Sequence, residues 1–323
     1  MERKYLLPQE GQFYKANLHS HCTESDGHLT PEEAKEAYKA KGYQIYAFSD
    51  HRKIVPHPEL KDENFLPITS LEFDVKDMRD PDRFDKPTYH LNFFSKDEMR
   101  TKFVPYDWEL LKTQYRVEDI NDVIRRANEA GFLAQYNHPR WSCQDVRDFG
   151  GLEGLWGFEV INGECHSTKM DGWGDVEFHQ MCCMGKFLCP TGSDDNHNCH
   201  PFDDPNCGSF KGWTMIKAPS LTYDAVLTAM EKGNLYATTG PEIKELYIED
   251  GKVHMKTTPA KVLLLRTEYR PHIIQRAFDD SLTHAVFDLS KFKKQPNFIR
   301  FEVWDSHNEK AMTRAYLPEE FQF

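Results

Sequence analysis

The sequence predicts an α/β fold in residues 1–240, followed by a small antiparallel β domain in residues 241–323. Short runs of β-branched and aromatic residues alternate with helical stretches through the first part, as in repeated βα units. After residue 240 these give way to short alternating strands broken by turns such as Glu249-Asp250-Gly251. The length of 323 residues suits one large domain with a smaller one attached. The alternation alone leaves two architectures open, a barrel or a doubly wound sheet.

Helices in the first part are predicted from their end signals. Thr30 is a favourable N-cap, Pro31 follows at the first helical position, and Gly42 stands where this helix should end. Two further helices are predicted over residues 117–130 and 223–231, each followed by a glycine. The strands that we expect between the helices cover residues 14–18, 44–48, 66–71, 89–94, 132–136, 157–161 and 186–190. Those expected in the second part cover residues 244–248, 252–256, 262–267, 284–288 and 298–304.

Charge and hydropathy exclude several classes of partner. The chain carries 52 acidic and 40 basic residues, a formal net charge of −12, whereas a protein that binds duplex DNA normally presents a basic face. Its longest apolar runs, such as residues 262–265, are far shorter than the ~20 residues of a membrane span. The N-terminal segment lacks the apolar stretch of a secretory signal, and the eight cysteines form no CxxC pair. We therefore expect a cytoplasmic protein with no duplex-DNA or membrane partner and with cysteines that are mostly buried small hydrophobes.

Histidines and carboxylates follow several of the predicted strands. His19 and His21 come directly after the first strand. Alternate residues of an extended segment point the same way, so this HxH pair places two imidazoles on one side of the chain, as a shared metal would require. Other potential metal ligands lie at or near the ends of later strands: His51, Glu72, His90, His138, Asp195 and His197. In parallel α/β folds the functional site lies at the carboxyl ends of the strands, so the pattern predicts a multinuclear metal site there.

These motifs resemble those of the PHP (polymerase and histidinol phosphatase) superfamily. The resemblance rests on residues 17–33, which read NLHSHCTESDGHLTPEE, and on Phe48-Ser49-Asp50-His51. Later motifs follow in order, ending with Asn137-His138-Pro139 and residues 192–197, which read GSDDNH. Membership would imply a distorted (β/α)7 barrel over roughly residues 14–240, with up to three divalent metals at its mouth.

The resemblance also implies which side chains would hold the metals and which ions they would prefer. Glu72 would bridge two ions. Asp26 stands where some members have a histidine, which resembles the small-phosphoesterase branch and favours manganese or iron, with zinc as the third candidate. Asp194 precedes Asp195, so the carboxylate of the DxH motif is ambiguous, although spacing favours Asp195. The full implied set, for two to three ions, is His19, His21, Asp26, His51, Glu72, His90, His138, Asp195 and His197.

Such a set predicts a positively charged site in which a metal-bound hydroxide attacks a phosphate. Asp50 and His166 are candidates to protonate the leaving group, although Asp50 could equally orient a histidine ligand. Arg140 follows a ligand segment, and its guanidinium would suit a phosphate; its alternative role is a surface ion pair. A loop starting at residue 74 and ending at residue 86 would either cover the substrate or be a solvated insertion.

The function that we expect is metal-dependent hydrolysis of a small phosphorylated metabolite or nucleotide, either a phosphomonoester or a cyclic phosphodiester. Two alternatives stay open. The same site could hydrolyse a carbamate, ester or amide, since a β domain after the barrel also resembles the carbaryl-hydrolase-like branch. The chain could instead be a non-catalytic metal-binding module, against which the complete ligand set weighs. The leaving group, the oligomeric state and the role of the β domain are not encoded in any recognisable pattern.

Overall fold

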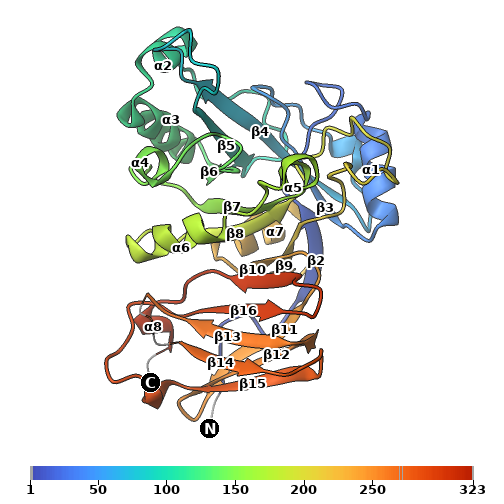
Figure 1. Cartoon of the computed structure of the whole chain (residues 1–323). Coiled ribbons are helices and arrows are strands. Elements are labelled where there is room, and N and C mark those ends of the chain that lie inside the picture. Colours follow the sequence, from blue (N-terminus) through green and yellow to red (C-terminus); the bar gives the residue numbers. More distant parts are fainter. Residues whose placement is uncertain (1–2, 269, 271, 322–323) are drawn as a thin grey trace.

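The computed structural model describes residues 3–268, 270 and 272–321, in which most of the strands belong to one mixed sheet (Figure 1). The thirteen strands of this sheet lie in the order β14-β13-β16-β17-β10-β9-β2-β3-β4-β5-β6-β7-β8. Those of the first part are β2 (Gln12–Asn17), β3 (Ile45–Phe48), β4 (Leu66–Lys76), β5 (Thr88–Ser95), β6 (Phe132–Tyr136), β7 (Gly157–Asn162), β8 (Cys189–Ser193), β9 (Trp213–Ala218) and β10 (Leu235–Thr238). No helix in the described part of the chain is both long and apolar enough to cross a membrane.

The first part is mixed α/β, but its strands do not follow the uniform parallel repeat that we expected. Strands β2, β3 and β4 are parallel, as are β6, β7 and β8, whereas β5 is antiparallel to both of its neighbours. The physical reason lies between β4 and β5, because residues 77–87 form a loop without a helix, and a parallel crossover needs a dozen or more residues. The strand order does not by itself show a closed barrel, so the distorted (β/α)7 barrel stays a prediction.

The two halves of this sheet meet beyond the ends of β2 and β8. Ser20 and Asn196 form an isolated parallel bridge, and the amide of Asp195 donates to the carbonyl of His19 at 2.8 Å. The amide of His21 in turn donates to the carbonyl of Asn196 at 3.2 Å. Residues that are about 175 positions apart in the chain are therefore fixed side by side by backbone hydrogen bonds.

The helices form where their end signals predicted them. Thr30 caps the first helix by accepting from the amide of Glu33, whose carboxylate accepts from the amide of Thr30 in a capping box. On α3 the buried residues recur at helical spacing and form a stripe that joins the core of the first part. The helices are α1 (Pro31–Ala40), α2 (Trp108–Gln114), α3 (Val117–Glu129), α4 (Val146–Phe149), α5 (Gly163–Lys169), α6 (Asp175–Cys183), α7 (Tyr223–Glu231) and α8 (Pro318–Phe321). Two short 3₁₀ helices lie at Pro58–Leu60 and Leu289–Lys291.

The seventh predicted strand is displaced by three residues. We expected residues 186–190, but β8 covers Cys189–Ser193. The chain leaves α6 through Gly185, which has a positive φ of 81°, and the amide of Lys186 still bonds to the carbonyl of Met181. Lys186 therefore belongs to the helix end, and the shift brings Asp195 to within two residues of the end of β8.

The second part of the chain contains all five of the strands expected there, with small shifts at their ends. They correspond to β11 (Ile243–Glu249), β12 (Lys252–Ala260), β13 (Val262–Arg266), β15 (Leu282–Asp288) and β16 (Arg300–Trp304). The structure adds β14 (Ile273–Arg276) and β17 (Lys310–Thr313). Strand β1 (Lys4–Tyr5) pairs with β11 in a separate sheet ordered β1-β11-β12-β15, so residues from both ends of the chain build this region, where both termini also lie (Figure 1).

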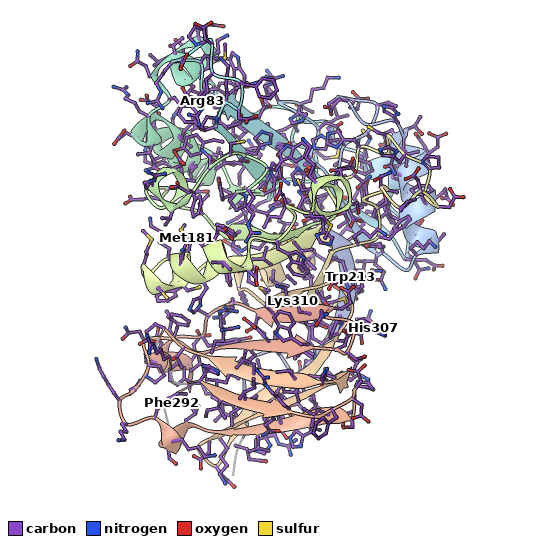
Figure 2. The ribbon with its side chains drawn as sticks, in the orientation of Figure 1. Arg83, Met181, Trp213, Phe292, His307 and Lys310 are labelled. Atoms are coloured by element: carbon purple, nitrogen blue, oxygen red, sulfur yellow. The ribbon has the colours of Figure 1, made fainter. Side chains whose placement is uncertain are left out.

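The two parts share a sheet and a hydrophobic core. Strand β17 pairs antiparallel with β10, which makes the main sheet continuous across residue 240. Figure 2 shows Lys310 where the C-terminal strands face α6, and its Nζ lies 2.7 Å from a carboxylate oxygen of Asp175 and 3.7 Å from the ring centre of Trp173. The division at residues 240 and 241 stays a prediction about domains.

Candidate metal centre

All nine side chains of the expected ligand set gather in one region, in overlapping groups. The central group contains His19 and His21, which are fully buried, together with Glu72 and Asp195. Nε2 of His19 lies 3.1 Å from Oδ1 of Asp195 and 3.3 Å from Oε1 of Glu72. Nε2 of His21 lies 3.0 Å from the same Asp195 oxygen and 3.4 Å from Oε2 of Glu72. Two imidazole nitrogens and two carboxylates thus face one another, a donor set suited to a divalent metal.

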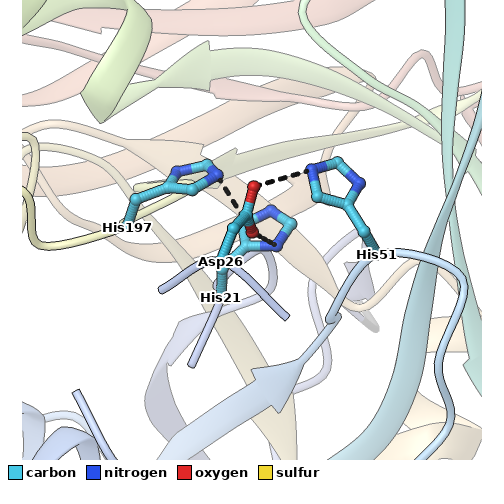
Figure 3. Close-up of side chains that lie close together, drawn as sticks. All are labelled: His21, Asp26, His51 and His197. Carbon is cyan, nitrogen blue, oxygen red and sulfur yellow. Dashed lines mark ion pairs between the residues drawn. The ribbon is translucent and has the colours of Figure 1, made fainter. Parts of the chain in front are cut away.

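A second group surrounds Asp26 (Figure 3). The Asp26 carboxylate lies between three imidazoles, at 3.5 Å from Nδ1 of His21, 3.7 Å from Nε2 of His51 and 3.6 Å from Nε2 of His197. Its side chain is about half exposed, at 55%. His21 also belongs to the central group, so the two groups have this residue in common.

A third group adds His90 and His138. Nδ1 of His90 lies 3.0 Å from Oε1 of Glu72, and Nε2 of His138 lies 3.4 Å from the same oxygen. The other Glu72 oxygen faces His21 and also lies 3.3 Å from Nδ1 of His51. Glu72 therefore stands between the groups and has one oxygen on each side, an arrangement suited to the bridging role that the family resemblance implies.

The chemistry of these atoms fits resident metal ions. Four of the polar atoms that converge here are buried without a hydrogen-bond partner in the described structure: Nε2 of His19, Nε2 of His21, Nδ1 of His51 and Oδ1 of Asp195. Buried polar atoms are nearly always satisfied, because an unsatisfied one costs about 1–3 kcal/mol. Imidazole nitrogens and carboxylate oxygens without other partners are the atoms that would coordinate a divalent cation.

The electrostatics of the cluster favour positive charge. Burial by itself would lower the pKa of His21, but the carboxylates of Asp195 and Glu72 outweigh it and raise this pKa to about 10. Burial likewise works to raise the pKa of Glu72, and the surrounding imidazoles, beginning with His19 and His90, hold it well below its usual range. The carboxylates therefore create a strongly negative potential at the ring nitrogens, which divalent cations would neutralise while displacing protons.

The structure separates the roles of Asp194 and Asp195. Asp194 is turned away from the cluster and accepts from the amides of Phe210, Lys211 and Gly212 at 2.7–3.0 Å. Asp195 faces the two buried histidines and has a positive φ of 54°, which is uncommon for a residue with a side chain. Such backbone strain concentrates at functional sites, and here the hydrogen bond from its amide to His19 holds it.

Glu159, a buried carboxylate in the middle of β7, was not predicted from the sequence. Its Oε1 lies 2.9 Å from Nδ1 of His19, on the side of the ring away from Glu72 and Asp195. Its Oε2 accepts from the amide of His138 at 3.1 Å. A carboxylate on the far nitrogen fixes the tautomer and orientation of a ligating imidazole. An acidic residue inside an otherwise apolar strand was the signal that could have revealed it.

Asp50, His166 and Arg140, which were predicted to transfer protons or to bind phosphate, lie outside the cavity that the cluster lines. Asp50 is buried and accepts from the amide of Cys22 at 3.0 Å and from Oγ of Ser25 at 2.6 Å. It therefore supports the loop between His21 and Asp26, and both of its expected roles, as a proton donor or as the orienter of a histidine, stay predictions.

Arg140 is exposed, and its Nε donates to Glu177 at 3.2 Å, so it makes the surface ion pair named as its alternative. His166 packs against Trp173, with 6.2 Å between ring centres, and its buried Nδ1 has no hydrogen-bond partner in the described structure. None of Asp50, Arg140 and His166 is among the described residues that line the cavity over the cluster.

That cavity has a volume of about 370 Å³, within the range of small-molecule sites. Its lining combines cluster residues with side chains from α5 and from the loop after β6: His51, Glu72, His90, His138, Trp141, Glu164, Cys165, Thr168, Lys169, Asp195 and His197. Burial, with the nearby charge of Asp195 next in size, raises the pKa of Glu164 to about 7. Trp141, Glu164 and Lys169 were not identified from the sequence, because nothing local marks a loop or helix residue as part of a cavity wall.

Comparisons with known proteins find chains of similar structure among the solved structures. No family model matches the chain, and no curated protein matches it. A two-domain protein from Bacteroides vulgatus, containing a predicted PHP-like metal-dependent phosphoesterase, is 17% identical over 94% of this chain and 95% of its own, with a TM-score of 0.49. A putative metal-dependent phosphoesterase from Bifidobacterium adolescentis is 15% identical over 59% of this chain and 89% of its own, with a TM-score of 0.36.

An amidohydrolase from Chromobacterium violaceum is 14% identical over 68% of this chain and 96% of its own, with a TM-score of 0.38. The chain is thus similar to solved structures described as metal-dependent phosphoesterases, one of them as predicted PHP-like, and to one described as an amidohydrolase.

Proposed function

We propose that this protein is a metal-dependent hydrolase that cleaves a small phosphorylated metabolite or nucleotide, as a phosphomonoester or a cyclic phosphodiester. One observation carries the proposal: six imidazoles and three carboxylates converge around Glu72, with polar atoms that have no other partner, on the wall of a cavity. A purely structural polar network would satisfy its own members.

Two to three divalent ions, of manganese, iron or zinc, are the cofactors that this donor set suits. His19, Glu72 and Asp195 would hold one ion, Asp26 with His51 and His197 another, and Glu72 with His90 and His138 the third, while His21 would complete either the first or the second set. When bound, such ions supply Lewis acidity, which activates water at neutral pH and offsets the charge of a phosphoryl group.

The protein's own residues orient this arrangement. Glu159 holds Nδ1 of His19, so that Nε2 faces the central group. The side-chain amide of Asn137 donates to Oε1 of Glu72 at 3.0 Å and also to Asn92 at 3.0 Å, which fixes the plane of the shared carboxylate. Fixed ligands cost no reorganisation as the reaction proceeds, which is how a preorganised site lowers its barrier.

A substrate panel tests the proposal. The protein, loaded in turn with manganese, iron or zinc, is assayed against phosphomonoesters, cyclic phosphodiesters, aryl carbamates, esters and amides. We expect turnover of phosphoesters in at least one metal form, loss of turnover on chelation, and competitive inhibition by inorganic phosphate. Turnover of a carbamate, ester or amide without any phosphoester activity would replace the proposal by a carbonyl hydrolase. No turnover of any member by a protein that carries its full metal content would favour the non-catalytic metal-binding module.

A further inference from the structure

One wall of the cavity is built from residues that belong to none of the metal-ligand groups. Helix α5 contributes Glu164, Cys165, Thr168 and Lys169, and the loop after β6 contributes Trp141. This wall lies beside the cluster and lines the same space of about 370 Å³. Such a volume holds a whole small metabolite, so a substrate that reaches the cluster also meets this wall.

Lys169 is the lysine of the cavity lining, and its charge has no carboxylate partner among the described residues. Its Nζ lies 4.2 Å from the ring centre of Trp141, and no hydrogen bond or ion pair is made to it in the described structure. Other cations near the site are paired: Arg52 lies 3.5 Å from a carboxylate oxygen of Asp74, and Lys53 lies 3.0 Å from one of Glu24. The Lys169 side chain is exposed, so its ammonium group is accessible to an anion that enters the cavity.

The position of Lys169 is defined at both ends of its side chain. Its backbone closes the last turn of α5, since Met170 follows in the left-handed conformation with φ of 60°. Its ammonium group rests over the partly exposed indole of Trp141, an attractive cation–π arrangement. The aliphatic part of the Lys169 side chain is thus held in place, while the N–H donors of Nζ remain available. This reduces the side-chain entropy that is lost when an anion binds.

We propose that Lys169, supported by Trp141, binds a second anionic group of the substrate, a carboxylate or phosphate other than the phosphoryl group that reacts. The inference rests on the proposed function, in which the reacting phosphoryl group lies at the cluster. It narrows the substrate class to small phosphoesters that carry a further negative charge. It also assigns to Lys169 the anion-binding role that the sequence analysis gave to Arg140, whose guanidinium is paired with Glu177.

The test measures binding, so that it does not depend on turnover. Calorimetric titrations of the manganese-loaded protein compare methylphosphonate with the phosphonocarboxylates phosphonoacetate, 3-phosphonopropionate and 4-phosphonobutanoate. Methylphosphonate reports the cluster alone, and the series places a carboxylate at increasing distances from the phosphonate. A charge-assisted contact predicts that at least one phosphonocarboxylate binds roughly tenfold more tightly than methylphosphonate.

Three variants test whether Lys169 is responsible for the tighter binding of phosphonocarboxylates. Lys169→Met should reduce it to less than about threefold, whereas Lys169→Arg should retain most of it because the charge remains. Lys252→Met, at an exposed lysine on β12, is the matched control and should retain the whole gain.

Three results would overturn the inference, and they are distinguishable. A wild-type protein that binds every phosphonocarboxylate no better than methylphosphonate, or a gain that survives in Lys169→Met, removes the second-anion role and leaves the phosphoesterase proposal standing. Failure of methylphosphonate itself to bind the metal-loaded protein removes the phosphoesterase proposal and this inference with it.

Discussion

At the scale of single residues, Glu72 is the carboxylate that two of the ligand groups have in common. It is buried, it belongs to two of the ligand groups, and its two oxygens face different histidines. Replacing a shared carboxylate removes a ligand from more than one ion at once. Replacing a residue that ligates a single ion would not have that effect.

The variant Glu72→Gln should therefore lose at least one equivalent of metal and lower kcat/KM by more than about a hundredfold. The amide keeps the shape of the side chain, so circular dichroism should show a folded protein. Metal content by elemental analysis and steady-state kinetics give the two readouts. His254→Gln, on the second sheet at β12, is the control and should be near neutral in both; an equal loss there would contradict the assignment of the site.

Glu159 gives a finer residue-scale prediction, because its Oε1 contacts Nδ1 of His19, on the opposite side of the ring from the central group. Glu159→Gln preserves an acceptor for Nδ1 of His19 but removes the negative charge that increases the basicity of the imidazole. Metal affinity should fall by about 10–100-fold, measured by competition with a chromogenic chelator. Unchanged affinity would show that the charge of Glu159 is irrelevant to the cluster and that its role is confined to packing.

The grouping of the nine candidate ligands could be predicted because they belong to short motifs that resemble those of a known family, and several of them follow strand ends, which converge in α/β sheets. Glu72 and His90 instead lie inside β4 and β5. Glu159 has no accompanying motif, since its role depends on which histidine its strand places beside it. The ion pair of Arg140 could not be chosen over a phosphate contact from the sequence for a related reason. Its partner, Glu177, is on α6, and only the packing of that helix determines which charge the guanidinium meets.

At the scale of elements, the contact between α6 and β16 joins the two parts of the chain through polar groups. Arg300 is almost fully buried, and its guanidinium lies 2.7 Å from Glu302 and within 3.4 Å of Nδ1 of His179. Burial, followed by the positive charge of Arg300, lowers the pKa of His179 to about 4. The neutral imidazole accepts from the guanidinium, whereas a protonated one would repel it.

This contact should make stability depend on pH in a defined window. A histidine whose folded pKa is depressed contributes stability that is complete above its unfolded value of 6.5 and is lost as the pH falls toward 4. Because the ring is only about half buried, the loss is roughly 1–2 kcal/mol. His179→Gln keeps an acceptor and should remove that part of the decline between pH 6.5 and 4, measured by urea unfolding at equal metal content. Parallel curves for both proteins would contradict this.

Strand identity could be predicted better than strand direction. Runs of apolar and β-branched residues located β3, β6 and β7 closely, because local composition decides whether a segment is extended. The direction of β5 depends on the absence of a helix between residues 77 and 87, and the pairing of β10 with β17 joins segments about 75 residues apart. Neither depends on local periodicity, so both were missed.

At the scale of the whole molecule, the main sheet is continuous across the domain boundary predicted at residue 240. Strand β10 lies on the first side of it and has β9 and β17 as neighbours, so removing the C-terminal residues would leave β10 as an unpaired edge. Tyr236, Met215 and the N-terminal Leu6 and Leu7 share their core cluster with residues of the C-terminal strands. A chain cut at residue 240 would expose this apolar surface to water.

Residues 1–240 expressed alone should therefore aggregate or unfold noncooperatively, whereas the full chain should unfold in one transition. Several fully buried apolar side chains would become exposed, at about 1.5–3 kcal/mol each, which matches or exceeds the 5–15 kcal/mol by which most domains are stable. In the full chain, limited proteolysis should not release two stable fragments near Gly240, since the flanking strands β10 and β11 are both paired. A soluble 1–240 fragment that binds its full complement of metal would contradict the prediction, because it would show that the first part folds without the strands that complete its sheet.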